Sequence, residues 1–224
     1  MKKSRRINQI LLSISLFFIV ATVHAQYDPQ VKYGKAIDQF EKDDLACPPD
    51  TNGILMLGSS SFTKWRDVQD YFPDKNITNR GFGGSQMSDI LYFKERLVLP
   101  YEPSQVWVFV GGNDMAAGEQ PKQVFAEAQQ LVNWLKEQYL DIDILFISMK
   151  PTPKRWALKK QLLSYNKKLK RYARKTEAVT FVDIWDAMLN ADGEPNEELY
   201  ISDMLHMNAQ GYAIWKEALL PYLK

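Results

Sequence analysis

Short apolar runs alternate with stretches of helical periodicity along most of this chain. The apolar runs, expected as strands, are residues 54–57, 76–79, 106–110, 142–149 and 179–182. The expected helices are residues 29–44, 62–70, 87–99, 121–139, 155–174, 183–190 and 209–223. Residues 106–110 have no polar position on either face, as in a strand covered on both sides. Because parallel strands need crossovers, this alternation predicts a three-layer α/β fold with a five-stranded, mostly parallel sheet.

Residues 1–25 have the three-part form of a secretory signal peptide. Four basic residues precede an apolar run from Ile10 to Val23, and Val23-His24-Ala25 is a small-x-small cleavage site. The apolar run is shorter than the roughly 20 residues that a membrane-spanning helix needs, and two serines interrupt it. We therefore expect export to the periplasm or the outside of the cell, with cleavage before Gln26. A retained membrane anchor is the alternative.

Cleavage would leave 199 of the 224 residues and remove four of the 28 basic residues. The mature chain would then have 24 basic and 27 acidic residues, so it is mildly acidic. A net charge of about −3 argues against a nucleic-acid partner. The length fits one domain, residues 26–224, with an N-terminal helix and loop over 26–50. No later stretch reaches spanning length, so no transmembrane segment is expected in the mature chain. Cys47, the only cysteine, excludes an intramolecular disulfide and is expected to be buried or inert.

Three consecutive predicted strands end in turns of glycine and small polar residues. These turns are Gly58-Ser59-Ser60, Gly81-Phe82-Gly83-Gly84-Ser85 and Gly111-Gly112-Asn113-Asp114. Ligands of open α/β sheets bind outside the carboxyl ends of the strands, and glycine lets a ligand approach backbone N–H groups closely. Each turn is ordinary by itself, but their shared edge favours a binding site with a serine as candidate nucleophile.

His206 is the only histidine left once His24 is removed with the signal, so a histidine base in the mature chain can only be this residue. Asp203, three residues earlier, can present a carboxylate to the imidazole and fix its tautomer. Asn208 is expected to cap the last helix, which leaves Asp203 and His206 available for chemistry.

Several other kinds of site fit the sequence poorly. Gly81-Phe82-Gly83-Gly84 has neither the dinucleotide GxGxxG spacing nor a P-loop lysine and hydroxyl, which argues against a nucleotide. A single histidine without a cysteine cluster is a weak metal-ligand set, so no metal or other cofactor is expected. The GxSxG elbow of α/β hydrolases is also missing, because Phe62 stands where the second glycine would be.

The three turns, together with Asp203 and His206, resemble the four sequence blocks of SGNH, or GDSL-type, esterases. The resemblance runs from about residue 53 to the C-terminus and implies a flavodoxin-like fold with strand order 2-1-3-4-5. It implies Ser60 as nucleophile, His206 as base and Asp203 as its orienting acid. It also implies an oxyanion hole formed by the backbone of Ser60 and Gly84 and the side chain of Asn113. Ser59, in place of the family's Asp, is unexplained, and Ser61 is expected to cap the next helix.

The resemblance implies an exported serine esterase that hydrolyses carboxylic esters through an acyl-enzyme. The expected substrate is a small-molecule ester, or a short acyl or acetyl group on a glycan or lipid. A decayed binding module that holds an acylated glycan or lipid without hydrolysing it is the alternative. Residues 150–156, at another strand end, either line the pocket or form a surface loop with a helix-packing tryptophan.

Overall fold

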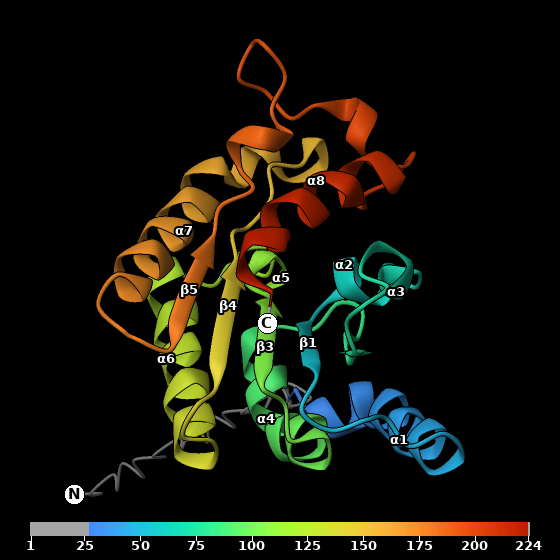
Figure 1. The fold of residues 1–224 in the computed structure, drawn as a ribbon. Helices are drawn as coiled ribbons and strands as arrows, with labels where there is room; N and C mark the ends of the chain where they lie inside the picture. Colours follow the sequence, from blue (N-terminus) through green and yellow to red (C-terminus); the bar gives the residue numbers. More distant parts are fainter. Residues whose placement is uncertain (1–26, 224) are drawn as a thin grey trace, which may run out of the picture.

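A computed structural model describes residues 27–223 and contains a five-stranded sheet in which every strand pairing is parallel (Figure 1). The strands, in the order β2-β1-β3-β4-β5, are β1 Ile54–Gly58, β2 Ile77–Asn79, β3 Gln105–Phe109, β4 Asp143–Ile147 and β5 Val179–Val182. The predicted α/β class and the flavodoxin-like strand order are both confirmed. The predicted signal peptide lies outside the described residues.

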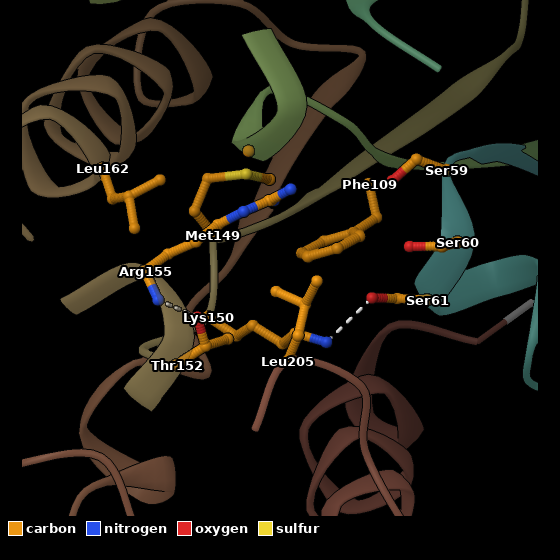
Figure 2. Close-up of a pocket in the computed structure, with 11 residues that line it drawn as sticks. Ser59, Ser60, Ser61, Phe109, Met149, Lys150, Thr152, Arg155, Leu162 and Leu205 are labelled. Atoms are coloured by element: carbon orange, nitrogen blue, oxygen red, sulfur yellow. Dashed lines mark hydrogen bonds between the residues drawn. The ribbon is translucent and has the colours of Figure 1, made fainter. Parts of the chain in front are cut away.

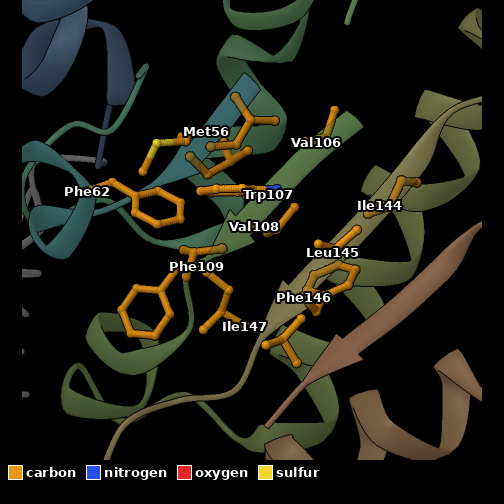
Figure 3. Close-up of a cluster of buried hydrophobic side chains, with 14 of the residues drawn as sticks. Met56, Phe62, Val106, Trp107, Val108, Phe109, Ile144, Leu145, Phe146 and Ile147 are labelled. Atoms are coloured by element: carbon orange, nitrogen blue, oxygen red, sulfur yellow. The ribbon is translucent and has the colours of Figure 1, made fainter. Parts of the chain in front are cut away.

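The two central strands, β1 and β3, are buried along their whole length. Their register pairs Gly58 with Phe109, so the turns that follow the two strands start side by side. Figure 3 shows the packed side chains of β3 and β4 beside Met56 of β1 and Phe62. Burial on both faces explains why these strands read as continuous apolar runs in the sequence.

Helices cover both faces of the sheet. They are α1 Pro29–Ala46, α2 Ser60–Thr63, α3 Val68–Tyr71, α4 Met87–Val98, α5 Gly112–Ala116, α6 Pro121–Gln138, α7 Lys159–Ala173 and α8 Ala209–Leu219. Short 3-10 helices are η1 Leu99–Tyr101, η2 Pro153–Leu158, η3 Asp186–Met188, η4 Glu197–Leu199 and η5 Leu220–Tyr222. Helix α6 packs between α4 and α7, whereas the end of the chain after α8 lies over β3 (Figure 1).

Aromatic packing fixes α2 and α8 near the ends of the central strands. The Trp215 ring of α8 contacts those of Phe109 and Phe62 at centroid distances of 4.6 and 6.1 Å, both edge-on. All three side chains are buried. Edge-to-face pairs of this kind add to the burial of apolar area, so the segments after β1 and before α8 are held on a rigid support.

Helix α1 packs against α4 and reaches the turn after β2. Tyr33 and Ile37 of α1 are buried, and the Tyr33 ring meets Phe82 edge-on at 5.0 Å. Arg96 of α4 forms ion pairs with Asp38 and Glu41 at 2.8 and 2.6 Å, on a face where solvent weakens them. The N-terminal helix is therefore part of the packing around the second glycine turn.

Some predicted helix boundaries are wrong. Residues 62–70 form two one-turn helices, α2 and α3, and the helix expected over 155–174 begins at Lys159. Before it lies η2, in which Arg155 has a non-helical backbone with φ −118° and ψ 19°. The neighbouring prolines supply no N–H for a regular helix there. Residues 183–190 contain only the short η3, and the structure has no helix among the described residues that is long and apolar enough to span a membrane.

Cys47 is exposed, so the expectation of a buried thiol is wrong, whereas its inertness stays a prediction. It occupies the C-cap of α1 with φ −145° and ψ 86°, where the chain turns away from the helix into Pro48-Pro49. The C-terminal end of α1 therefore carries this thiol at the surface.

Candidate active site

The predicted site residues lie in four segments at the carboxyl edge of the sheet. Ser60 begins α2 directly after β1, and Asn113 lies in α5 after β3. The glycine turn after β2 touches both, since the Asn113 Nδ2 donates to the Ser85 carbonyl at 2.9 Å. In the same turn, a Cβ built at Gly83 would lie 3.8 Å from the Ser60 Cβ. The sheet thus brings the three turns together, as predicted.

His206 bridges Ser60 and Asp203. Its Nε2 lies 2.8 Å from the Ser60 Oγ, and its Nδ1 lies 2.6 Å from the Asp203 Oδ2. The other carboxylate oxygen of Asp203 accepts the backbone N–H groups of Leu205 and His206 at 3.0 and 2.9 Å. With the Nδ1 proton held by the carboxylate, Nε2 is the ring nitrogen that can accept a proton from the serine.

The loop that carries Asp203 and His206 is anchored on both sides. Met204 has a left-handed backbone with φ +56°, which turns the chain between the two residues. The Met204 carbonyl accepts the Lys154 N–H at 3.0 Å, and Tyr200 donates its hydroxyl proton to the Pro151 carbonyl. Asn208 caps α8 as predicted, because its side chain accepts the N–H groups of Gln210 and Gly211. The imidazole is therefore positioned by backbone contacts as well as by Asp203.

Electrostatics keep His206 neutral and Asp203 ionised. Burial lowers the pKa of His206, and this outweighs the opposite effect of Asp203, while Lys150 and Lys64 add to the lowering. For Asp203, burial raises the pKa, but the hydrogen bonds from His206 and the loop backbone hold it well below its usual range. A neutral imidazole beside an ionised carboxylate is the arrangement that a general base requires near neutral pH.

Three N–H donors near Ser60 are available to a ligand. The backbone N–H groups of Ser60 and Gly84 donate to no residue of the part that the structure describes. The Asn113 amide uses one N–H on the Ser85 carbonyl, and its Oδ1 accepts Arg155 Nη2 at 2.6 Å, so its orientation is fixed with the second N–H unused. Gly84 has φ +85°, a conformation that favours glycine. These donors can stabilise negative charge that develops on an oxygen.

A small cavity of about 30 Å³ opens beside Ser60 (Figure 2). It is lined by Ser59, Ser60, Ser61, Phe109, Gly112, Met149, Lys150, Thr152, Arg155, Leu162 and Leu205. A cavity of this size admits only a small group of a bound molecule. Of the two interpretations of residues 150–156, pocket lining is correct for Lys150, Thr152 and Arg155. Trp156 does not line the cavity and stacks on Trp185 with centroids 6.2 Å apart.

The two serines beside Ser60 have different environments. Ser61 was expected to cap α2, but this is wrong, because the helix begins at Ser60 and Ser61 lies inside it. Its buried hydroxyl accepts a hydrogen bond from Lys150 Nζ at 2.8 Å. Ser59 occupies the N-cap position without a side-chain cap bond, and only its carbonyl bonds to the helix. Ser60 is the serine whose hydroxyl meets His206.

The structure also brings together three carboxylates that the sequence analysis did not single out. One oxygen each of Asp114, Glu119 and Glu127 lies within 4.8 Å of the others, close enough for the group to hold a metal ion. Asp114 is fully buried, and one of its oxygens accepts the Met87 N–H at 2.7 Å. The second oxygen has no partner in the described chain, and burial raises the pKa of Asp114 to about 7. Asp114 lies in α5 and Glu127 in α6, so the spacing of these residues along the sequence did not indicate that their carboxylates meet.

The Asp114→Asn variant is expected to be more stable than the wild type at pH 8, with a smaller difference at pH 5. An Asp with a folded pKa of about 7 and an unfolded pKa of 3.8 keeps its proton longer in the folded state. Its contribution to stability is therefore present at low pH and lost as pH rises from about 4 to 7. The shift corresponds at most to about 4 kcal/mol. Asn retains the acceptor for the Met87 N–H.

Thermal unfolding between pH 5 and 8 measures this difference, with EDTA present so that no divalent cation occupies the carboxylates. If the difference in Tm between the variant and the wild type were the same at pH 5 and at pH 8, a raised pKa of Asp114 in the folded protein would be contradicted.

The fold and the His206 geometry define a class of protein in which a histidine lies within hydrogen-bond distance of both a serine hydroxyl and a carboxylate. The chain belongs to the GDSL-like lipase/acylhydrolase family, whose model matches residues 51–214. It is thus a carboxylic ester hydrolase, as the sequence predicted. No curated protein matches the chain significantly.

Solved structures with the same fold come from several bacteria. A provisionally named platelet activating factor from Streptococcus pneumonia is 20% identical, with a TM-score of 0.77 over 87% of this chain and 94% of its own. A GDSL-like lipase from Bacteroides thetaiotaomicron is 18% identical, with a TM-score of 0.70 over 83% and 95%. An acetylxylan esterase from Geobacillus stearothermophilus is 16% identical, with a TM-score of 0.60 over 78% and 93%. At these identities the likeness concerns the fold.

Proposed function

We propose that this chain is an exported serine esterase that removes acetyl or other short acyl groups from a glycan or lipid, with Ser60 as nucleophile. The observation that carries the proposal is the His206 ring, which lies 2.8 Å from the Ser60 Oγ and 2.6 Å from Asp203. Both distances are within hydrogen-bond reach, as base and orienting carboxylate require.

In the acylation step, the Ser60 Oγ attacks the carbonyl carbon of the ester while His206 Nε2 takes the hydroxyl proton. Asp203 stabilises the imidazolium that forms. The backbone N–H groups of Ser60 and Gly84 and the free N–H of Asn113 bind the oxyanion. When the intermediate collapses, the bond to the alcohol breaks, and Nε2 gives its proton to the departing oxygen. Ser60 is then esterified.

In the deacylation step, water attacks the acyl-enzyme and His206 Nε2 takes its proton. The same donors bind the second oxyanion, and its collapse releases the carboxylic acid and returns the proton to Ser60 Oγ. No other proton carrier is needed, because one nitrogen acts as base and then as acid in each half of the reaction.

The cavity beside Ser60 cannot take up a long acyl chain, which supports a short acyl group on the reacting carbonyl. It has about 30 Å³, and its wall contains Lys150 and Arg155 among the apolar side chains. A long alkyl chain would need more room and would desolvate two cationic groups without pairing them. The acetylxylan esterase that shares the fold acts on an acetylated glycan, which is consistent with this proposal.

We expect kcat/KM on 4-nitrophenyl acetate to exceed that on 4-nitrophenyl octanoate by at least about tenfold, since forcing methylenes into a filled site costs about 1–3 kcal/mol. Initial rates on the acetate, butanoate and octanoate esters measure the preference. The Ser60→Ala variant, assayed on every chain length, gives the background. Equal or faster hydrolysis of the octanoate would contradict a short-acyl site.

Export is proposed from residues 1–25, whose basic start, apolar run and small-x-small end have the form of a signal peptide. Expression of the full chain in a bacterial host should give a periplasmic protein with Gln26 as its first residue. N-terminal sequencing of the fractionated protein measures this. A chain that keeps Met1 and stays with the membrane would instead support the retained anchor.

A further inference from the structure

Two cationic side chains in the wall of the cavity have no acidic partner. Lys150 is only 5% exposed, and its Nζ donates to the neutral hydroxyl of Ser61 at 2.8 Å. Nζ also lies 5.9 to 6.0 Å from the rings of Phe109, Tyr200 and Trp215, near the limit for cation–π attraction. Among residues 27–223, no carboxylate lies within 4.0 Å of it.

Arg155 is the second cation. Its Nη2 donates to the Asn113 Oδ1 at 2.6 Å, and no other hydrogen bond or ion pair joins its guanidinium to the described part of the chain. A Cβ at position 112 would lie 2.9 Å from its Nη1, so Gly112 leaves the space that the guanidinium occupies. Since a guanidinium stays protonated, Arg155 brings a permanent positive charge to this wall.

Lys150 is buried and Arg155 is half-buried, and a cation removed from solvent without an ion-pair partner is unfavourable. Consistent with this, burial and the nearby charge of Arg155 lower the pKa of Lys150 to about 7, while Asp203 has a smaller opposite effect. Asp203 is already bound to His206. Asp114 acts on the charge of Arg155 but forms no ion pair with it. The cavity therefore carries positive charge that no ion pair among residues 27–223 neutralises, beside Ser60 (Figure 2).

We infer that Lys150 and Arg155 form a subsite for a small oxyanion, a carboxylate or phosphate, on the alcohol part of the ester substrate. The inference rests on the proposed function, because it places the anionic group next to the bond that Ser60 would attack. An oxyanion accepts charge-assisted hydrogen bonds from both side chains and supplies the counter-charge that they lack. The small volume of the cavity suits a single charged group of the alcohol, so the acyl group lies outside the cavity in this arrangement.

A matched pair of acetate esters tests the subsite. Acetoxyacetate and acetoxyacetamide have the same acetyl group and the same length, but only the first carries a carboxylate. We expect the wild type to prefer acetoxyacetate by about tenfold or more in kcat/KM, measured by titration of released acid at constant ionic strength. Lys150→Met and Arg155→Gln should each reduce this ratio several-fold, whereas Arg155→Lys should restore part of it.

Lys154→Gln is the matched control, because Lys154 is an exposed lysine on the same short helix and has no side-chain contact with the cavity. The ratio of the two kcat/KM values is the readout, since Arg155 also touches Asn113 and its variants can slow both substrates. A wild-type ratio near one, or a ratio that Lys154→Gln lowers as much as Arg155→Gln, would overturn the inference.

Inorganic phosphate provides a test that needs no turnover. At constant ionic strength, phosphate should raise the Tm of the wild type and of Ser60→Ala, but not of Lys150→Met or Arg155→Gln. If no ester is hydrolysed while phosphate still stabilises the protein through these residues, the proposed function fails and the anion site stands. Hydrolysis without anion preference or phosphate stabilisation would refute the site alone.

Discussion

Replacement of Ser60 by alanine is expected to lower kcat on 4-nitrophenyl acetate by at least about 1000-fold, with the fold and Tm retained. The proposed reaction forms a covalent bond to the Ser60 Oγ, and loss of a nucleophile in hydrolases of this mechanism removes most of the rate enhancement. The residual rate should be the small contribution of the oxyanion donors. Steady-state kinetics on residues 26–224 measures the loss.

Ser59→Ala is the matched control for this variant. Ser59 adjoins Ser60 and lines the same cavity, but its side chain makes no hydrogen bond to the helix that follows. It should keep most of the wild-type rate and still react with a fluorophosphonate, whereas Ser60→Ala should not be labelled. Labelling of Ser60→Ala, or equal loss of activity in both variants, would move the nucleophile to another residue. A wild type without any turnover or labelling would favour the binding-module alternative.

The second large effect is expected for Asn113→Ala, which should lower kcat by about 100- to 1000-fold and change KM much less. The Asn113 amide is held by the Ser85 carbonyl and by Arg155, so its remaining N–H is fixed in direction. A donor of this kind binds the oxyanion more strongly than the ground-state carbonyl, and its removal costs about 3 to 4 kcal/mol in the barrier.

The kcat and KM of the wild type and of Asn113→Ala on 4-nitrophenyl acetate test this prediction. Asn133→Ala, which removes an exposed amide from α6, is the control and should retain wild-type kinetics. The oxyanion role would be refuted if Asn113→Ala raised KM and left kcat unchanged. Thermal unfolding of the variant shows whether loss of the bond to Ser85 has disturbed the turn.

Much of the fold could be predicted because the central strands are buried on both faces. Residues 106–110 read as a continuous apolar run in the sequence, and Gln105–Phe109 is indeed a fully buried central strand. Helix boundaries were harder, as at Arg155, where neighbouring prolines and a non-helical backbone delay the start of α7. Such boundaries depend on local hydrogen bonding, which apolar spacing does not report.

The sequence by itself determined the α/β class, the order of the four blocks and the one histidine that a mature chain would have for base chemistry. Apolar periodicity and the count of a residue type do not depend on tertiary contacts, so they could be read directly. The resemblance to a known family added the strand order and the assignment of Ser60. Asn208 as a helix cap was likewise predictable, because capping is a contact between near neighbours.

Only the tertiary structure decided how these groups meet. The bond between Ser60 and His206 joins residues 146 positions apart, that between Lys150 and Ser61 joins residues 89 apart, and that between Arg155 and Asn113 joins residues 42 apart. Parallel strands return every turn to one edge of the sheet, and packing against that edge selects which side chains touch. For this reason the role of Ser61, the unpaired cations of the cavity and the carboxylates around Asp114 could not be read from the order of residues.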